Sequence, residues 1–415
     1  MTRRSAFERR LHRELHAARP PRAADAERRS WQVVRAAHAA RAPIRQRRRG
    51  ARLALAVGAA LAAAALALTP AGARMGDWID EVVSPHTSLS SLPTAGRLLV
   101  VADGSAWLVS DDGARRQLGA FSDASWSPGG LHVVAARGNE LVALDPDGNE
   151  NWSRPAAGRV TVPRWSPGYG YRIAYRSGAD LYVTAGDNTD NRLLWHGTRP
   201  TPPAWKPLPP AAEQAVAFAA GSRVLVVEVD TGRVLGRTPP GPTPREIWWA
   251  EGGRRLVTVT SRSVRVHGPH GRLLRTVDLP PGFTSAGSAV APRGRRLAVI
   301  AQATGDRSTS RLLLIRLDRP APPRSVFSAG GAFEGLTWSI DGSLLVVGVP
   351  AADQWLFVRP KGSMGLESVQ PIREKFEGGR EPRRGTFPRP AGWCYSEPAN
   401  PAAGGQPPCS TGSAP

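Results

Sequence analysis

Cysteine is nearly absent from this chain of 415 residues: there are two, Cys394 and Cys409, and both lie in the last 22 residues. Two thiolates cannot supply the four ligands of a structural zinc site, and no histidine stands near either of them in the sequence. Because no cysteine precedes residue 394, a zinc-type anti-sigma module is also excluded from the N-terminal part. Outside the cytoplasm such a pair oxidises, so the sequence predicts a structural disulfide, with a redox pair as the alternative.

Recognisable catalytic motifs are also lacking. No Gly-x-Ser-x-Gly elbow occurs, and the nearest segment, residues 282–287, misses the spacing. The one close histidine pair, His267 and His270, spans a turn without a third ligand nearby, which favours a solvated turn. Residues 145–150 and 187–191 resemble fragments of calcium loops but lack the glutamate at position 12, which favours hairpin turns. We therefore expect no catalytic, cofactor-binding or metal-binding residues and predict that the chain is not an enzyme.

Lysine is scarce: there are three lysines against 52 arginines, and the net charge is +21. Residues 1–52 contain 16 arginines and four acids, a net of +12, so more than half of the charge lies there. Residues 53–73 follow with no charge at all, long enough for roughly 30 Å of helix. The pattern predicts a basic arm at 1–50 and a transmembrane helix at 51–73.

Charge also predicts the orientation of that helix. Positive residues stay on the cytoplasmic side, so the N-terminus is expected inside the cell and the rest of the chain outside. Arg45, Arg47, Arg48 and Arg49 are expected to lie against anionic lipid headgroups. No DNA-binding motif appears, and no nucleic-acid partner is expected. Cleavage near Ala73, which would give a secreted protein, remains the alternative. Two short amphipathic helices in the arm would lie on the inner leaflet or dock a cytoplasmic partner.

A tryptophan-led phrase recurs through the middle of the chain. Its copies are centred on Trp126, Pro128 and Gly130; Trp165 and Pro167; Trp205 and Pro207; Trp249 and Gly253; and Trp338 and Gly342. A degenerate copy, without the tryptophan, occurs at Val290. The spacings between successive copies, from Trp126 through Val290 to Trp338, are 39, 40, 44, 41 and 48 residues. This period is typical of β-propeller blades, and the tryptophans are interpreted as blade-core anchors.

The segments around each copy predict the strands of a blade. One short strand runs into the tryptophan, a turn rich in Pro and Gly follows, and then a β-rich run begins. Such second strands start near residues 97, 131, 171, 214, 254, 295 and 343, which predicts an all-β propeller of about seven four-stranded blades, with six or eight as alternatives. Residues 74–92 are assigned to a juxtamembrane stub and linker, 93–360 to the propeller, and 361–415 to a flexible Pro/Gly-rich tail. Ring closure is expected to borrow a strand from the other end of the chain.

The Trp-Ser-Pro-(Asp/Gly)-Gly phrase followed by an aliphatic strand resembles the repeat of TolB-type, WD40-like β-propellers. The resemblance implies the fold far more than the activity, because this group includes periplasmic interaction modules and propellers attached to peptidases. The chain departs from the usual phrase at Lys206, Glu251 and Val290.

The expected propeller is itself basic, with 31 basic and 22 acidic residues over 97–360. Equivalent turns of adjacent blades carry Arg254, Arg255, Arg293, Arg295 and Arg296, which predicts an arginine rim suited to an anionic envelope polymer or an acidic protein face. The preference for arginine over lysine throughout the chain is the compositional alternative. The sequence thus predicts a membrane-anchored, non-catalytic protein- or ligand-binding module of the cell envelope that requires no cofactor and relays to a cytoplasmic partner through residues 1–50. A channel-site enzyme of lactonase or quinoprotein type remains the second hypothesis.

Overall fold

The computed structural model describes residues 91–167, 171–207, 214–305, 309–360, 365–376, 387–397 and 409–412. All of them belong to one unit, Ala64–Pro415. The basic arm at 1–50, the apolar segment at 51–73 and nearly all of the stub at 74–92 lie outside the described residues. Within the ranges that are described, no helix has both the length and the apolar character needed to cross a membrane.

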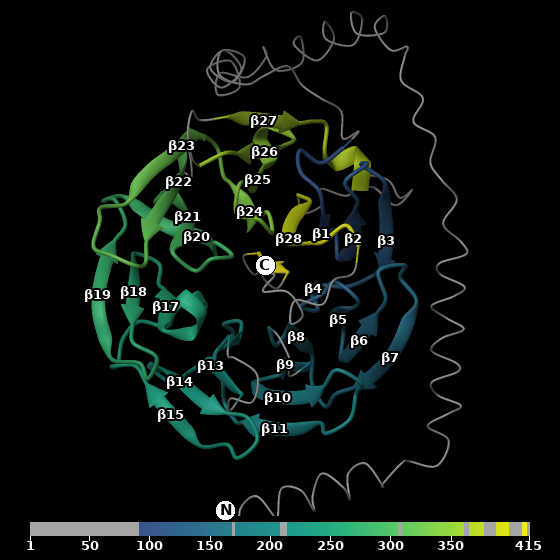
Figure 1. Cartoon of the computed structure of the whole chain (residues 1–415), viewed down its shortest axis with the longest axis vertical. Helices are drawn as coiled ribbons and strands as arrows, with labels where there is room; N and C mark the ends of the chain where they lie inside the picture. The colour runs from purple at the N-terminus through teal and green to yellow at the C-terminus, as the bar shows by residue number, and fades with distance from the viewer. Residues whose placement is uncertain are drawn as a thin grey trace, which may run out of the picture. The chain divides into compact units, whose positions relative to one another are not determined.

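Seven antiparallel sheets account for the described strands (Figure 1). The sheet that closes the ring runs from its inner edge outward through β29 (Ser410–Thr411), β28 (Arg389–Cys394), β1 (Arg97–Ala102), β2 (Ser105–Val109) and β3 (Arg115–Gly119). The next three sheets, each given from the inner strand outward, are β4 (Asp123–Trp126), β5 (Val133–Arg137), β6 (Glu140–Leu144) and β7 (Glu150–Pro155); β8 (Val160–Trp165), β9 (Arg172–Ser177), β10 (Asp180–Ala185) and β11 (Arg192–Trp195); and β12 (Ala204–Trp205), β13 (Ala215–Ala220), β14 (Arg223–Glu228) and β15 (Val234–Arg237).

The remaining three sheets follow the same order. They are β16 (Glu246–Ala250), β17 (Arg255–Val259), β18 (Ser263–His267) and β19 (Leu273–Asp278); β20 (Phe283–Val290), β21 (Arg296–Ala303), β22 (Thr309–Arg316) and β23 (Arg324–Gly330); and β24 (Glu334–Trp338), β25 (Leu345–Val349), β26 (Gln354–Val358) and β27 (Leu366–Val369). Three short 3-10 turns, η1 (Glu251–Gly253), η2 (Pro350–Ala352) and η3 (Arg373–Phe376), complete the described elements.

The sheets form a closed ring of seven blades. Each inner strand contacts the inner strand of the next blade, in the order β4, β8, β12, β16, β20, β24 and β28, and β28 contacts β4 again. The prediction of seven four-stranded blades is therefore confirmed. The second strands of the blades begin within two residues of the predicted starts, because local turn and β-branched patterns mark those positions.

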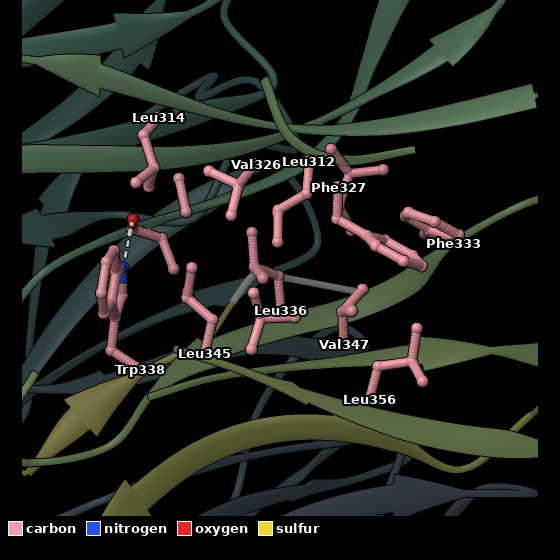
Figure 2. Packing of buried hydrophobic residues seen from close by; sticks show 14 of the residues in the cluster. Leu312, Leu314, Val326, Phe327, Phe333, Leu336, Trp338, Leu345, Val347 and Leu356 are labelled. Atoms are coloured by element: carbon pink, nitrogen blue, oxygen red, sulfur yellow. Dashed lines mark hydrogen bonds between the residues drawn. The ribbon is translucent and has the colours of Figure 1, made fainter. Parts of the chain in front are cut away.

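The core lies between neighbouring blades rather than within one sheet. In the largest cluster, Leu312 and Leu314 of β22 face Leu336 and Trp338 of β24 across the gap between two blades (Figure 2). The outermost strands are more exposed; β7, for example, has no fully buried residue. Each blade therefore buries its faces only against its neighbours, as expected of a repeat architecture.

Ring closure uses a strand from the far end of the chain, as the sequence suggests, but from further along than the predicted propeller boundary at residue 360. β28 pairs with β1, joining Arg97 to Cys394 at one end of the ladder. β27, β28 and β29 all lie within 361–415, where the sequence predicts a flexible tail. Ile372 and Phe376 pack on the first blade without pairing with it; they are buried in a cluster with Leu98.

Candidate functional site

The repeat tryptophans stand at the ends of inner strands and link neighbouring blades. All five are at most 7% exposed. Three of them donate their indole N–H to a carbonyl of the preceding inner strand: Trp205 to Arg164 O (2.9 Å), Trp249 to Ala204 O (3.1 Å) and Trp338 to Ala289 O (2.9 Å). These contacts agree with the interpretation of the tryptophans as blade-core anchors.

Two tryptophans depart from this pattern. The indole N–H groups of Trp126 and Trp165 are buried and find no acceptor among the described residues. The guanidinium of Arg97 lies 5.0 Å from the ring centroid of Trp126, and the His132 ring stacks on Trp165 at 6.3 Å. Near the junction with the closing blade, ring stacking thus takes the place of the indole bond.

The prolines and glycines of the phrase form the turns after the inner strands. Gly130 has a φ of +72°, and a Cβ there would lie 2.5 Å from Cys394 Sγ, so glycine is required both by the backbone and by the disulfide beside it. Gly253 and Gly342 also have positive φ. Pro128 offers its carbonyl oxygen to the Cys409 N–H at 3.0 Å. Lys206, which departs from the usual phrase, places its ammonium 5.5 Å from the Trp249 ring centroid.

The ends of the inner strands enclose a cavity of about 180 Å³. Its lining is rich in indole and pyrrolidine rings, including Trp165, Pro167 and Pro207, and it also contains residues 409–412. One buried carboxylate, Glu246, lines it and accepts a hydrogen bond from Ser288 Oγ. We call this the tryptophan–proline cavity.

Residues 409–412 lie among the inner strands of three blades. A disulfide joins Cys409 to Cys394 in β28, with a Cα–Cα distance of 4.5 Å. Ser410 Oγ donates to Trp338 O at 2.7 Å and accepts from Trp393 N at 3.0 Å, and Gly412 N donates to Ala391 O at 2.7 Å. β29 contacts β24, β28 and β4, near the middle of the ring (Figure 1). The chain therefore places its own segment at the inner edge of the closing blade.

A second cavity, of about 260 Å³, lies where the inner strands begin. Its lining includes Asp123, Glu334 and Arg389, the first residues of β4, β24 and β28, and Arg245, which directly precedes β16. The tryptophan–proline cavity is lined by the last residues of β4, β8 and β12 together with Glu246, the first residue of β16, and Arg164 lines both cavities. We call the second cavity the arginine cavity.

Charge in the arginine cavity is only partly paired. Arg164 Nη1 lies 3.2 Å from Asp123 Oδ2, and both side chains are nearly buried (12% and 7% exposed), so they form an internal ion pair. Arg245 donates to the carbonyl of Ser285. The guanidinium of Arg389 makes no hydrogen bond or ion pair in the described part of the chain, and its Nε is buried. The lining carries three guanidinium groups against two carboxylates.

The five predicted rim arginines occupy two adjacent turns. The N–H of Glu251 in η1 donates to Gly294 O at 3.3 Å, which brings the turn of one blade against that of the next. Arg255 pairs with Glu251 at 3.4 Å, and the guanidinium of Arg296 lies 5.4 Å from the Trp338 ring centroid. Arg254, Arg293 and Arg295 are exposed. These turns follow inner strands, as do those of the tryptophan–proline cavity.

The histidine pair differs from its prediction as a solvated turn. His270 is exposed, but His267 ends strand β18 and is 2% exposed. Its Nδ1 lies 3.2 Å from Gly271 O and its Nε2 lies 3.1 Å from Thr258 Oγ1. Burial lowers the pKa of His267 to about 4. The side chain is therefore a neutral, hydrogen-bonded core residue.

The two acidic segments form turns between third and fourth strands. Asp145 Oδ1 accepts from the N–H groups of Asp147 and Asn149, at 2.9 Å each, and Asp187 Oδ1 accepts from Thr189 N at 3.0 Å. Both carboxylates are therefore engaged with their own turns. Across the described ranges, no group of three or more His, Cys, Asp or Glu is arranged to hold a metal ion.

The arginine cavity was not identified from the sequence. Its charged residues come from separate blades and converge only when the ring closes, so no local pattern marks them. A weak signal exists in the repeat register: Asp123, Arg245 and Glu334 each stand three or four residues before a repeat tryptophan. A search for charged residues at that register would have grouped them.

Solved structures similar to this one are β-propellers. The β-propeller domain of Cps50 (Swd1) from Myceliophteria thermophila is 14% identical, with a TM-score of 0.51, and the match covers 66% of this chain and 99% of that domain. The C-terminal WD40 domain of Sif2 is 12% identical, with a TM-score of 0.51, over 80% of this chain and 99% of that one. Kuenenia stuttgartiensis hydrazine synthase is 14% identical, with a TM-score of 0.49, over 57% and 76%. At these identities the similarity shows the fold alone, and no curated protein matches the sequence.

A family model described as outer membrane protein assembly factor BamB matches residues 86–311. That span covers more than half of the chain, and it extends from the linker before the first blade into β22. Because this match covers more than half of a chain that folds as a closed propeller, the chain belongs to the BamB family of β-propellers.

Proposed function

We propose that this chain is a non-catalytic binding module of the cell envelope, anchored by one transmembrane helix, with its propeller outside the cytoplasm. The family description names an assembly factor, which is a role based on binding other proteins. The tryptophan-led repeat, similar to that of TolB-type interaction modules, supports the same class of role. The uncharged run at 53–73 and the +12 net charge of residues 1–52 support the anchor and its orientation.

The observation that carries this proposal is the size of the space left at the ring centre. Residues 409–412 lie among the inner strands, and the two cavities there measure about 260 and about 180 Å³. Pockets for small molecules are typically larger, about 300–1,000 Å³. Cavities of this size suit side chains inserted by a macromolecule that lies across the ring. The exposed arginines of the rim would contribute long-range attraction to an acidic partner surface.

A quinoprotein-like enzyme is the second candidate, favoured by the convergence of three guanidinium groups and two carboxylates in the arginine cavity. A flat quinone cofactor also needs an aromatic or apolar face beside such charges. Phe333, the aromatic residue of that lining, is 1% exposed and stacks on Phe327 in the core. The tryptophans line the other cavity. The described residues therefore do not fit this group, and we derive no reaction step from it.

Fractionation of cells with intact-mass measurement tests the anchor. We expect a full-length species in the membrane fraction whose propeller is digested by protease added outside. A soluble species that begins near residue 74 would overturn the anchor and, with it, any relay to a cytoplasmic partner through residues 1–50.

Site-specific photo-crosslinking in cells tests the binding role. A photoreactive residue is placed at Ala332, in the lining of the arginine cavity, or at Arg293, on the rim; Leu273, exposed on the outer strand β19, provides the control. We expect discrete adducts from Ala332 or Arg293 and none from Leu273. The same weak smear from all three positions would contradict a binding surface at the ring ends.

A further inference from the structure

We propose that the arginine cavity binds a carboxylate of an acidic peptide segment on a partner protein. This inference rests on the proposed binding function and assigns its ligand class. The carboxylate would be held by Arg245 and Arg389, with the Gln302 amide as a neutral donor beside them.

The guanidinium groups of the cavity are not equivalent. Arg164 already has its counterion in Asp123 at 3.2 Å, inside a nearly buried pair. The guanidinium groups of Arg245 and Arg389 lie within 4 Å of no carboxylate in the part of the chain that the structure describes. That of Arg245 donates only to the Ser285 carbonyl, and that of Arg389 has no hydrogen-bond partner there. Because a guanidinium offers five donors in a planar fork, a carboxylate is the partner that matches the unused donors best.

Gln302 provides an independent indication that the cavity takes a polar ligand. This residue of β21 is 9% exposed and lines the cavity. Its backbone pairs within the sheet, and its side-chain amide has no hydrogen-bond partner within the described ranges. A side-chain amide in a cavity lining can donate to a bound carboxylate. The lining that holds Arg245 and Arg389 thus also carries a neutral donor.

The carboxylates of the cavity restrict the ligand to one negative group. Asp123 and Glu334 both line it, so three positive charges face two negative ones. A polyphosphate or another polyanion would place several charges near Glu334, and like charges in a partly desolvated site repel strongly. A peptide brings one carboxylate flanked by neutral backbone, and Glu334 can accept one of its N–H groups. At about 260 Å³ the cavity also suits one or two residues rather than a whole small molecule.

Binding of two matched peptides to the full-length protein tests the assignment. The probes are fluorescent eight-residue peptides of Gly and Ser that carry one central Glu or one central Gln, measured by anisotropy. We expect the Glu peptide to bind at least about tenfold more tightly, since charge-assisted hydrogen bonds are roughly twice as strong as neutral ones. Equal binding of the two peptides would overturn the carboxylate assignment.

Variants locate the binding. Arg389→Gln and Arg245→Gln should each remove the preference for Glu and leave binding of the Gln peptide unchanged, whereas Arg272→Gln, in the turn between β18 and β19, should change neither. Because Arg389 begins the closing strand, the binding result for Arg389→Gln is interpreted only if the Tm of this variant matches that of the wild type. Arg245 precedes β16, so Arg245→Gln provides the second, independent variant. Retention of the Glu preference in folded Arg245→Gln and Arg389→Gln would overturn the site.

A third probe distinguishes the ligand classes. A short polyphosphate of similar length should compete weakly with the Glu peptide, and Glu334→Gln should improve that competition. If polyphosphate binds the wild type better than the Glu peptide does, the acidic-peptide proposal is wrong. Crosslinks at Ala332 without any Glu preference would leave the binding function standing and reject only its ligand class.

Discussion

At the residue scale, the clearest titrating group of the described chain is His267. It is buried, its Nδ1 faces the Gly271 carbonyl and its Nε2 faces the Thr258 hydroxyl. The carbonyl can only accept, so Nδ1 carries the proton and Nε2 accepts from Thr258. The neutral ring is thus satisfied on both sides, and protonating Nε2 would break one of these bonds as well as bury a charge.

This arrangement predicts a loss of stability in mild acid. Burial lowers the pKa of His267 from 6.5 to about 4. Between these two pH values the unfolded state binds a proton at His267 that the folded state does not bind. The contribution of His267 is fully present above pH 6.5 and decreases as the pH falls toward 4, by about 3 kcal/mol in total. Denaturant unfolding of the wild type and of His267→Gln at pH 7 and pH 4.5 measures the difference.

The variant provides the internal comparison, because all other titrating groups are shared. We expect His267→Gln to be less stable at pH 7 but to lose less stability on acidification than the wild type. Parallel losses in the two proteins would show that His267 does not titrate as its surroundings indicate.

His267 also shows the limit of the sequence at this scale. The segment His267-Gly268-Pro269-His270 has the composition of a turn, and it does form one between β18 and β19. The strand before it, however, extends through His267, which pairs with Leu256 of β17. Whether a residue at a strand end faces the core depends on its register with the neighbouring strand, which turn composition alone does not provide.

At the element scale, the repeat tryptophans connect one blade to the next. Trp205, Trp249 and Trp338 each use the indole N–H to satisfy a carbonyl of the previous inner strand, in addition to burying the ring. The hydrogen bond and the buried surface act across the same interface between blades. In these three copies, this explains why the phrase begins with tryptophan rather than with another large apolar residue.

We therefore predict that replacement by phenylalanine has unequal costs around the ring. Trp249→Phe and Trp338→Phe each leave a buried carbonyl without its donor and should cost about 1–3 kcal/mol. Trp165→Phe removes an indole N–H that has no acceptor among the described residues and should cost about 1 kcal/mol less. Free energies of unfolding from denaturant titration measure all three. Equal costs would mean that ring packing alone links the blades.

The sequence predicts the inner and second strands of most blades, but not the strands within 361–415, of which the closing strand matters most. Inner and second strands are found because tryptophan, a Pro/Gly turn and β-branched runs mark them locally. The closing strand, Arg389–Cys394, reads Arg-Pro-Ala-Gly-Trp-Cys, and its proline, glycine and surroundings are typical of irregular chain. It becomes a strand only because β1 offers an open edge across the ring, which is a long-range effect.

At the scale of the whole molecule, ring closure depends on β28 and on the disulfide that ties it to residues 409–412. The disulfide spans a sequence separation of 15 residues and fixes Ser410 among the inner strands of the ring. A cross-link over a loop of this length stabilises by about 3 kcal/mol. Opening it frees the segment that packs against three blades.

Replacing both cysteines with serine should therefore lower the stability of the whole propeller, not only of its last segment. We expect Cys394→Ser/Cys409→Ser to lower the Tm by about 5 °C in oxidising buffer. Scanning calorimetry with and without reductant tests this, because reductant should shift the wild type to the value of the variant and leave the variant unchanged. A reductant-insensitive wild type would contradict a stabilising disulfide.

The pairing of Arg97 with Cys394 has a consequence for biosynthesis. A ribosome that adds 5–20 residues per second takes about 15–60 s to travel from the first strand to its partner. During that interval β1 presents an unpaired edge, which the β28 of another copy can fill as readily as its own. Newly made chains are thus exposed to exchange of this strand between molecules, and a product that stops before residue 389 has no means of completing the ring.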